Sequence, residues 1–499
     1  MSNLETKTGL IERPPVIAVM GHIDHGKSKL LDYIRKTNVV DKEAGGITQH
    51  TTAYEVVHSG HKITFVDTPG HAAFTTMRER GAQIADIAIL IVSAEEGVKA
   101  QTLEALQSIK DHETPFVVAI NKIDKPAADI EKAKQSLAEN GVFVEGYGGN
   151  IPVALISAKE GTGVNELLDL LLLVAELEEL KGGPNAPAEG FVLETRLDPK
   201  SGTTATFIIK NGTLHATDYI VVGKEITKIK RLADFLDHQI KDATFSAPVH
   251  IFGFAKLPTI GSPFKAFTDK KEAECFAACA PDEANCRRTL NCASETDGIV
   301  NLPIIIKADV AGTLEAVEKE LAKLKVENVN LHIVDLGVGS ITENDVKQVQ
   351  AFPNAKIIGF RVKAEKSALT LAEKASATIE TSDIIYKLSE WLEEEMKKAA
   401  PKQTIEEVLG KAKILKTFGG KGDKQIVGGI VGQGKVVRGK EVKILRRENE
   451  IGRGKIVGLQ MQKIKTDEVE ENTQFGAEID AKMEIAPGDY IEVFEITTK

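Results

Sequence analysis

Residues 21–28 read Gly-His-Ile-Asp-His-Gly-Lys-Ser, and this octapeptide constrains the fold more than any other stretch of the chain. It matches the phosphate-binding template G-x-x-x-x-G-K-[ST] and follows an apolar run, residues 16–20, that is typical of a buried strand. A strand, a glycine-rich loop and a helix in this order direct backbone N–H groups and the positive end of the helix at phosphate oxygens. We expect Lys27 to reach the β- and γ-phosphates and the Ser28 hydroxyl to ligate Mg²⁺. The predicted nucleotide contacts in this loop are Gly21, His22, Ile23, Asp24, His25, Gly26, Lys27 and Ser28.

A second short motif, Asp-Thr-Pro-Gly-His at residues 67–71, follows the next buried strand, residues 63–66. A carboxylate at a strand end can hold a Mg²⁺-bound water, and a glycine N–H there can bind a γ-phosphate. In isolation an Asp-Thr-Pro-Gly turn carries little information, but one strand after a phosphate loop it predicts a γ-phosphate sensor. The predicted contacts are Asp67, Thr68, Pro69, Gly70 and His71.

Two further motifs predict which base the nucleotide carries. Asn-Lys-Ile-Asp ends a later strand at residues 121–124, and Ser-Ala-Lys ends the one after it at residues 157–159. A carboxylate accepts hydrogen bonds from the guanine ring N–H and exocyclic amine, and adenine would leave that acceptor unpaired. The ordered set of motifs therefore predicts a GTPase domain. The base contacts expected are Asn121, Lys122, Ile123, Asp124, Ser157, Ala158 and Lys159.

The segment Gly-Gly-Ile-Thr-Gln-His at residues 45–50 lies between the phosphate loop and the sensor. A threonine after two glycines suits a segment whose hydroxyl joins Mg²⁺ only when the γ-phosphate is present, and such ordering is how a GTPase switches. We therefore expect Ser28, Thr48 and, through a water, Asp67 to hold the metal. The alternative is an ordinary flexible loop.

Length and composition indicate a large multidomain protein. The chain has 499 residues, 42% hydrophobic and 27% charged, with a formal net charge of −10. The acidic total disfavours a general nucleic-acid coat protein. No run is long and apolar enough to span a bilayer, and residues 1–13 lack the apolar centre of a signal peptide. We expect a cytoplasmic protein that does not contact membranes.

The order of patterns predicts a multidomain α/β and β fold class. Strand-like runs alternate with helical patterns up to about residue 179, which predicts a mostly parallel sheet, and short strands with turns such as Asn211-Gly212 then predict a β-barrel. Alternation resumes at Leu302, and the last hundred residues are again short, glycine-rich strands. The predicted parts are an amino-terminal tail (1–13), a P-loop GTP-binding domain (14–181), a β-barrel (188–270), a connector (271–298), a small α/β domain (299–381), a long connecting helix (382–400) and a second β-barrel (401–499).

All four cysteines, Cys275, Cys279, Cys286 and Cys292, fall in the connector. Their spacing matches no familiar zinc pattern, and structural disulfides are rare in the cytosol. We expect half-buried helix residues, with a metal or redox role as the alternative.

Taken together, these motifs resemble bacterial translation initiation factor 2. The resemblance is carried by residues 21–28, 44–50 and 67–74, with support from residues 81–83 and 488–494. It covers nearly the whole chain after Arg13, and the predicted domain order agrees with that family. Family members commonly carry a long amino-terminal extension, whereas 13 residues precede the first domain here.

The resemblance implies a ribosome-activated GTPase that uses GTP, GDP and Mg²⁺. It would place formylmethionyl initiator tRNA on the small ribosomal subunit and promote joining of the large subunit, with other initiation factors as possible partners. By similarity, His71 positions the attacking water, and Ile23 and Ile47 form an apolar gate around it. The alternative for His71 is a turn histidine exposed to solvent.

The last domain resembles the family's initiator-tRNA reader. Residues 411–465 hold 15 Lys and Arg against 4 Asp and Glu, and such a basic face suits tRNA phosphates, although a solvated surface is the alternative. Lys463 and Lys465 fall where the family has cationic pocket residues. Gly429 and Phe475 stand where many relatives have cysteines, and Gln474 where glutamate is common. Recognition of formylmethionine would therefore use altered contacts.

Two other functions share the nucleotide motifs. An elongation-type tRNA-delivery GTPase is disfavoured by the α/β domain at 299–400 followed by a second barrel. A GTP-loaded scaffold without turnover is disfavoured by Lys27, Thr48 and His71.

Overall fold

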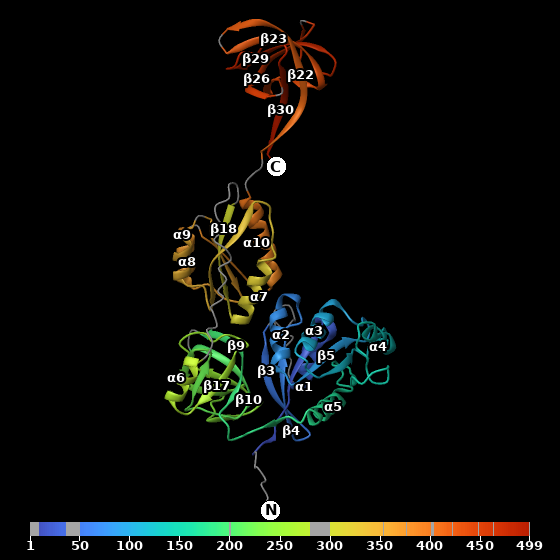
Figure 1. The fold of residues 1–499 in the computed structure, drawn as a ribbon, viewed down its shortest axis with the longest axis vertical. Helices are drawn as coiled ribbons and strands as arrows, with labels where there is room; N and C mark the ends of the chain where they lie inside the picture. Colours follow the sequence, from blue (N-terminus) through green and yellow to red (C-terminus); the bar gives the residue numbers. More distant parts are fainter. Residues whose placement is uncertain are drawn as a thin grey trace, which may run out of the picture. The chain divides into compact units, whose positions relative to one another are not determined.

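The computed structural model describes residues 9–35, 50–198, 201–279, 300–352, 354–375, 377–400, 404–421, 423–447, 449–462 and 464–498. The chain divides into two compact units, Met1–Ala400 and Pro401–Lys499 (Figure 1). Predictions made for five residues lie outside the described ranges and stay predictions: Ile47, Thr48, Cys286, Cys292 and Lys463.

The first sheet has six strands in the order β3-β4-β2-β5-β6-β7, parallel except for the antiparallel β3–β4 pair. Its strands are β2 (Val16–Gly21), β3 (Thr52–His58), β4 (His61–Asp67), β5 (Ile87–Ser93), β6 (Phe116–Asn121) and β7 (Val153–Leu155). Its helices are η1 (Ile23–His25), α1 (Lys27–Arg35), η4 (Ala72–Phe74), α2 (Thr75–Ile84), α3 (Ala100–Asp111), α4 (Ile130–Glu139) and α5 (Val164–Leu177). Parallel neighbours require crossover connections, so the predicted βαβ alternation has its physical basis here.

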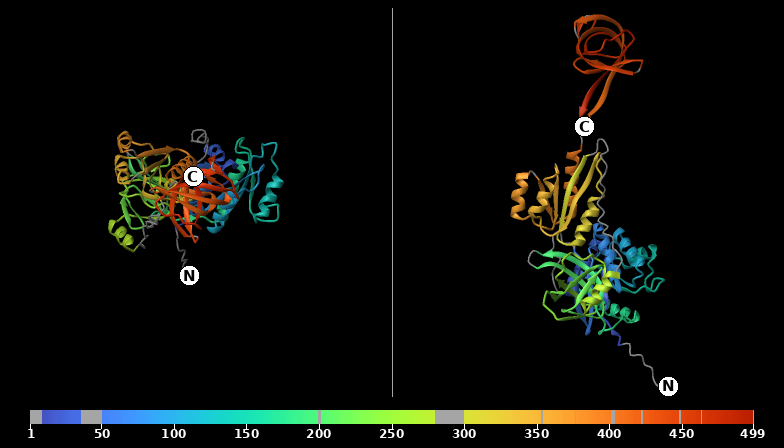
Figure 2. Two further views of the ribbon diagram at one scale, coloured as in Figure 1. Left: turned by 90° about the horizontal axis from the view of Figure 1, so that it is seen from above. Right: turned by 60° about the vertical axis from the view of Figure 1, so that its left-hand side comes forward.

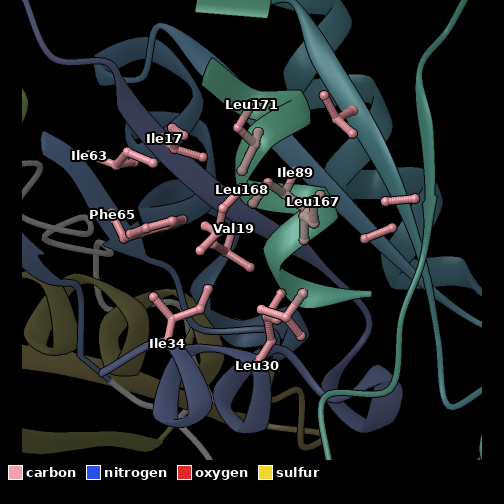
Figure 3. Packing of buried hydrophobic residues seen from close by; sticks show 14 of the residues in the cluster. Ile17, Val19, Leu30, Ile34, Ile63, Phe65, Ile89, Leu167, Leu168 and Leu171 are labelled. Carbon is pink, nitrogen blue, oxygen red and sulfur yellow. The ribbon is translucent and has the colours of Figure 1, made fainter. Parts of the chain in front are cut away.

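Helices cover both faces of this sheet, which explains why its central strands are apolar throughout. Ile17 and Val19 of β2 pack in one cluster with Leu30 of α1 and Leu168 of α5, as Figure 3 shows. Met20, on the opposite face of β2, belongs to a second cluster with residues of α3 and α4. The carboxyl ends of the parallel strands, where the sequence motifs stand, therefore rest on a rigid core.

The next sheet is antiparallel and has seven strands in the order β13-β12-β17-β9-β10-β16-β14 around one apolar core. Its strands are β9 (Glu189–Asp198), β10 (Gly202–Asn211), β12 (Tyr219–Val222), β13 (Glu225–Lys228), β14 (Arg231–Asp234), β16 (Pro248–Phe252) and β17 (Pro263–Phe267). Two small pairs accompany it: β1 (Ile11–Glu12) with β8 (Lys181–Gly182), and β11 (Thr213–His215) with β15 (Asp242–Thr244).

Helix α6 (Lys270–Cys279) follows this sheet and packs on it through Ala273 and Ala277. Cys275 and Cys279 are exposed on α6 as free cysteines, so the expectation of half-buried positions is wrong for these two. Within the described ranges, no group of three or more His, Cys, Asp or Glu side chains is placed to hold a metal ion.

The third sheet is parallel, with the order β19-β18-β20-β21. Its strands are β18 (Val300–Ala308), β19 (Val329–Val338), β20 (Lys356–Phe360) and β21 (Thr378–Ser382), and its helices are α7 (Ala311–Leu321), α8 (Glu343–Val349), α9 (Lys366–Ala375) and α10 (Ile385–Ala399). Helices α8 and α9 cover one face, and α7 and α10 cover the other (Figure 1, Figure 2).

Charged and apolar contacts join the first sheet to its neighbours within this unit. Asp86 accepts hydrogen bonds from two guanidinium nitrogens of Arg13, each at 2.6 Å, and from the Val16 N–H at 2.9 Å, and it pairs with Lys210 of β10. Phe74 of the sensor segment lies in the apolar cluster beneath α7 and α10. The segment that follows His71 is therefore part of the core of the α/β domain.

The second unit is a closed antiparallel barrel of order β25-β30-β22-β23-β29-β26-β27, closed because β25 pairs with both β30 and β26. Its strands are β22 (Thr404–Lys421), β23 (Lys424–Gly434), β25 (Glu441–Arg446), β26 (Asn449–Met461), β27 (Ile464–Lys465), β29 (Gln474–Ala481) and β30 (Tyr490–Thr498), with a separate pair β24 (Val436–Val437) and β28 (Glu468–Val469). The predicted multidomain α/β and β fold class is confirmed. Among the described residues, no helix is both long and apolar enough to cross a bilayer.

Candidate nucleotide site

The loop between β2 and α1 adopts a conformation that its glycines allow. Gly21 and Gly26 have φ angles of +140° and +89°, which other residues rarely adopt. A Cβ on Gly21 would lie 2.5 Å from the Ile91 carbonyl oxygen, so the loop also needs glycine for space. Asn121, at the end of β6, donates from Nδ2 to the His25 carbonyl oxygen at 2.7 Å. The phosphate loop is thus fastened to the strand that carries the base motif.

Lys27 is buried at the start of α1. Its Nζ donates to the carbonyl oxygens of Gly21 and His22, each at 2.7 Å. The pKa of Lys27 is lowered to about 7, mainly by burial. The Asp67 carboxylate raises this pKa and the Arg78 charge lowers it, but both effects are smaller than that of burial. Phosphate oxygens would restore the charged form of this amine, because they supply the counter-charge that burial removes.

The sensor motif lies beside the phosphate loop because β2 and β4 are parallel neighbours. Asp67 is in register with Val19, and the Thr68 hydroxyl donates to the Val19 carbonyl oxygen at 2.9 Å. A Cβ on Gly70 would overlap the Lys27 ammonium, so Gly70 and Lys27 are in direct contact. The predicted γ-phosphate sensor and phosphate loop therefore meet in the structure.

The base motifs meet through two hydrogen bonds. The Ala158 N–H donates to the Asn121 Oδ1 at 2.9 Å, and the Ser157 hydroxyl donates to Asp124 Oδ1 at 2.7 Å. The Ser157 hydrogen bond outweighs burial and holds the pKa of Asp124 below its ordinary value. Asp124 is therefore a carboxylate at neutral pH, as reading the guanine ring N–H and amine requires.

The remaining base-motif residues lie in the same two turns. Lys122 has a left-handed φ of +67°, and its Nζ lies 3.7 Å from Glu95 Oε2. The Ile123 N–H donates to the Ile156 carbonyl oxygen at 3.4 Å, and Lys159 is exposed. The structure therefore brings together the two base motifs along with the loop that they support.

His71 is buried, with 6% of its surface exposed, so the alternative of a solvent-exposed turn histidine is not what the structure shows. Its Nδ1 accepts a hydrogen bond from the Ala73 N–H at 3.1 Å, which caps the η4 turn. Its ring lies 4.4 Å from the ring of Tyr386, centroid to centroid, and 5.9 Å from that of Phe74. Burial lowers the pKa of His71, so the ring is neutral at neutral pH.

Arg78 of α2 is a site residue that sequence reasoning missed. It is fully buried and donates to the carbonyl oxygens of Pro69 at 3.2 Å and His71 at 2.5 Å. Its second terminal nitrogen, Nη2, donates to the Glu104 carboxylate of α3 at 2.6 Å. Arg78 therefore fixes the backbone of the sensor loop to α3. An arginine within a helical pattern gives no sequence signal for such a role.

Ile23, one of the two predicted gate residues, lies next to the sensor loop. A Cβ on Gly70 would come within 3.2 Å of the Ile23 Cα. The Ile23 N–H donates to the Gln101 Oε1 at 3.1 Å, which links the loop to α3. The gate itself stays a prediction, because its second residue, Ile47, lies outside the described residues.

In the second unit, three of the five predicted pocket residues are neighbours. Gly429 of β23 pairs with Phe475 of β29, and a Cβ on Gly429 would lie 3.0 Å from the Phe475 ring. The Phe475 side chain is buried in the barrel core, whereas Gln474 beside it is exposed. Lys465 is exposed on β27 and pairs with Gln460 of β26.

Comparison with known proteins identifies the family. Residues 12–176 match the family described as Elongation factor Tu GTP binding domain, residues 187–267 match Elongation factor G domain 2, and residues 282–393 match Translation-initiation factor 2. The chain is 39% identical to translation initiation factor IF-2 of Rubrobacter xylanophilus over 496 residues, which cover 98% of this chain and 72% of that one. The chain belongs to the translation initiation factor 2 family.

Other members of the family match over a smaller share of their own length. Identity is 40% to IF-2 of Carboxydothermus hydrogenoformans and 42% to IF-2 of Bartonella quintana, and the chain spans 60% and 59% of those proteins. Among solved structures, GDP-bound aIF5B from Aeropyrum pernix is 28% identical with a TM-score of 0.46, covering 97% of this chain and 92% of that one.

Family membership confirms the predicted resemblance and makes the chain a translational GTPase of initiation that binds guanine nucleotide. The elongation-type alternative is not favoured, because the relatives are named as initiation factors and residues 282–393 match the initiation factor family.

The residues present also fit the metal that the family implies. Ser28, near the start of α1, offers a hydroxyl, and Asp67, at the end of the neighbouring strand β4, offers a carboxylate. Oxygen donors of these two kinds are the ligands that Mg²⁺ prefers. The third predicted ligand, Thr48, lies outside the described residues.

Proposed function

We propose that this chain is a ribosome-activated GTPase that acts as a translation initiation factor. Its partners are the small and large ribosomal subunits, formylmethionyl initiator tRNA and, in addition, other initiation factors. GTP is bound and hydrolysed by residues 14–181, and residues 401–499 read the initiator tRNA. The protein acts in the cytoplasm, promoting subunit joining with GTP hydrolysis.

One observation carries the nucleotide part of this proposal. The Asn121 side chain donates to the His25 carbonyl oxygen in the phosphate loop and accepts from the Ala158 N–H in the base loop. A single buried amide thus sets the spacing between the triphosphate and guanine sites. This pre-organisation supports tight binding, because little binding free energy is lost in ordering the two loops.

The chemistry that we propose is positioning and charge neutralisation. Lys27 neutralises the β- and γ-phosphates, and Ser28, Thr48 and, through a water, Asp67 hold Mg²⁺, which supplies further positive charge at the phosphates. His71 positions the attacking water. Burial favours the neutral imidazole, whose single acceptor nitrogen can accept a hydrogen bond from that water once it is released from the Ala73 N–H.

The proposed tRNA pocket differs from the arrangement common in the family. The Phe475 ring covers Gly429, where many relatives would present two cysteines. Because Gly429 and Phe475 face the barrel core, we propose that formylmethionine is read at the exposed Gln474 beside them, and that Lys463 and Lys465 bind backbone phosphates. Neighbouring strands are about 4.8 Å apart, so Lys465 on β27 is about 10 Å from β29, within reach of one nucleotide.

The test is ribosome-stimulated GTP hydrolysis by the full chain and by His71→Ala. We expect stimulated turnover to collapse in the variant while the affinity for GTP stays unchanged. Full turnover without His71 would refute its role.

Binding of formylated and unformylated initiator tRNA tests the second unit. We expect tighter binding of the formylated form, and equal binding would contradict the proposed initiation role.

A further inference from the structure

The ring of Tyr386, near the start of α10, contacts the ring of His71. The two ring centroids are 4.4 Å apart with the planes inclined by 51°, and the Tyr386 hydroxyl lies 3.5 Å from the His71 Nδ1. Tyr386 belongs to the α/β domain rather than to the nucleotide site, so nothing in nucleotide binding requires this contact.

The His71 side chain is turned toward α10. At Gly70 the Cβ direction points at the Lys27 ammonium. The next residue, His71, has φ −74° and ψ 144°, and its ring packs on the ring of Tyr386 in α10. The imidazole is therefore turned toward α10, while the residue before it faces the phosphate-binding lysine.

Contacts near the ring pair hold the sensor segment and α2 against the α/β domain. Phe74 lies in one buried cluster with Ile385 and Leu388 of α10. Arg80 of α2 pairs with Glu315 of α7 at 2.8 Å. Rotation of the imidazole toward the nucleotide would uncover the Tyr386 ring and break the Ala73 cap, so His71 is restrained unless α10 withdraws.

We propose that Tyr386 is a positioning residue that restrains His71 on α10 and thereby keeps GTP hydrolysis low until the α/β domain moves. The inference rests on the proposed role of His71 and adds the group that controls it. Any partner that shifts α10 would release the imidazole, so the ring pair connects that movement to hydrolysis.

The surroundings of His71 provide a readout that does not depend on activity. Besides Tyr386, the charged groups that face His71 are Arg78 of α2 and Glu320 and Lys323 of the α7 region. Burial is the main cause that lowers the pKa of His71, ahead of the Glu320 charge that opposes it. Removing the Tyr386 ring exposes the imidazole, so its pKa should rise toward the ordinary value of about 6.5.

The experiment compares the full chain with Tyr386→Ala, Tyr386→Phe, His71→Ala and the double variant Tyr386→Ala/His71→Ala. Tyr386 is 45% exposed, so its truncation should leave the thermal unfolding temperature nearly unchanged. Loss of one aromatic pair should raise ribosome-free GTP hydrolysis by about two- to tenfold in Tyr386→Ala. The phenylalanine variant keeps the ring and should keep the low rate, and the double variant should match His71→Ala. Glu390→Ala, an exposed position one turn along α10, is the matched control and should leave hydrolysis unchanged.

The outcomes separate this inference from the proposed function. An unchanged or lower ribosome-free rate in Tyr386→Ala, with no change in the His71 pKa measured by NMR, would overturn the restraint. A collapse of ribosome-stimulated turnover in His71→Ala would at the same time leave the proposed function standing. If His71→Ala keeps full stimulated turnover, the catalytic role of His71 fails, and with it the control that we assign to Tyr386.

Discussion

Replacement of Asn121 by alanine should weaken nucleotide binding without changing which base is preferred. Asn121 is 2% exposed, and its amide makes two hydrogen bonds to backbone groups, at 2.7 Å to the His25 carbonyl and 2.9 Å from the Ala158 N–H. Asp124, which we expect to read guanine, is held separately by Ser157. The two functions of the base motif, spacing and reading, are therefore on different side chains.

The size of the effect follows from the two hydrogen bonds. Each contributes about 1 kcal/mol, and a backbone group left without its partner costs about 1–3 kcal/mol. We expect Asn121→Ala to lose about 2–4 kcal/mol of binding free energy, which is roughly a 30- to 1000-fold rise in Kd for GTP and GDP.

The assay is competition against a fluorescent guanine nucleotide, with xanthosine triphosphate as the second ligand. Asn121→Ala should raise both dissociation constants by the same factor. Asp124→Asn should instead reverse the preference, because the amide donates where the carboxylate accepted. Asn140→Ala, which removes one amide hydrogen bond to the Ser136 carbonyl at 2.8 Å at the end of α4, controls for loss of a half-buried amide elsewhere. The reasoning is refuted if Asn121→Ala binds within threefold of the parent, or if its preference between the two bases moves.

Three other substitutions or measurements test the electrostatics and packing. Asp86→Ala should destabilise the first unit by about 3–5 kcal/mol in denaturant unfolding, because Lys210 would lose its buried counter-charge. Burial raises the pKa of Asp86, but Arg13 and Lys210 lower it by more, so the folded-state pKa lies below the ordinary value. The stability that Asp86 gives the folded protein should therefore be complete above about pH 4, and should be lost as the pH falls through the folded-state pKa. GTP binding at pH 8 should be accompanied by uptake of a proton at Lys27, because the pKa of this amine is about 7 before the phosphates raise it. Calorimetry in buffers of different ionisation enthalpy measures the proton uptake, and Lys27→Met should abolish that uptake. Gly429→Ala should destabilise the second unit by about 1–3 kcal/mol, since the added Cβ would lie 2.5 Å from the Lys413 carbonyl oxygen and 3.0 Å from the Phe475 ring, and an unchanged melting temperature would contradict that packing.

The nucleotide motifs could be predicted from sequence because each is short and stands at the carboxyl end of a strand. Lys27, Gly70 and Asp124 owe their roles to neighbours a few residues away and to parallel pairing, which the βαβ alternation already implies. The expectation of half-buried cysteines was wrong at Cys275 and Cys279, because α6 packs through its alanines and leaves both thiols exposed.

The sequence by itself determined the fold class, the GTPase motifs and the resemblance to a family of initiation factors. These properties depend on residue type and local order, which a linear pattern records. Only the tertiary structure decided what surrounds the γ-phosphate sensor, residues 67–71. Arg78 donates to its backbone, and the Tyr386 ring packs against His71. Such contacts join residues far apart in the chain, and their geometry depends on how whole domains pack, so no local pattern could predict them.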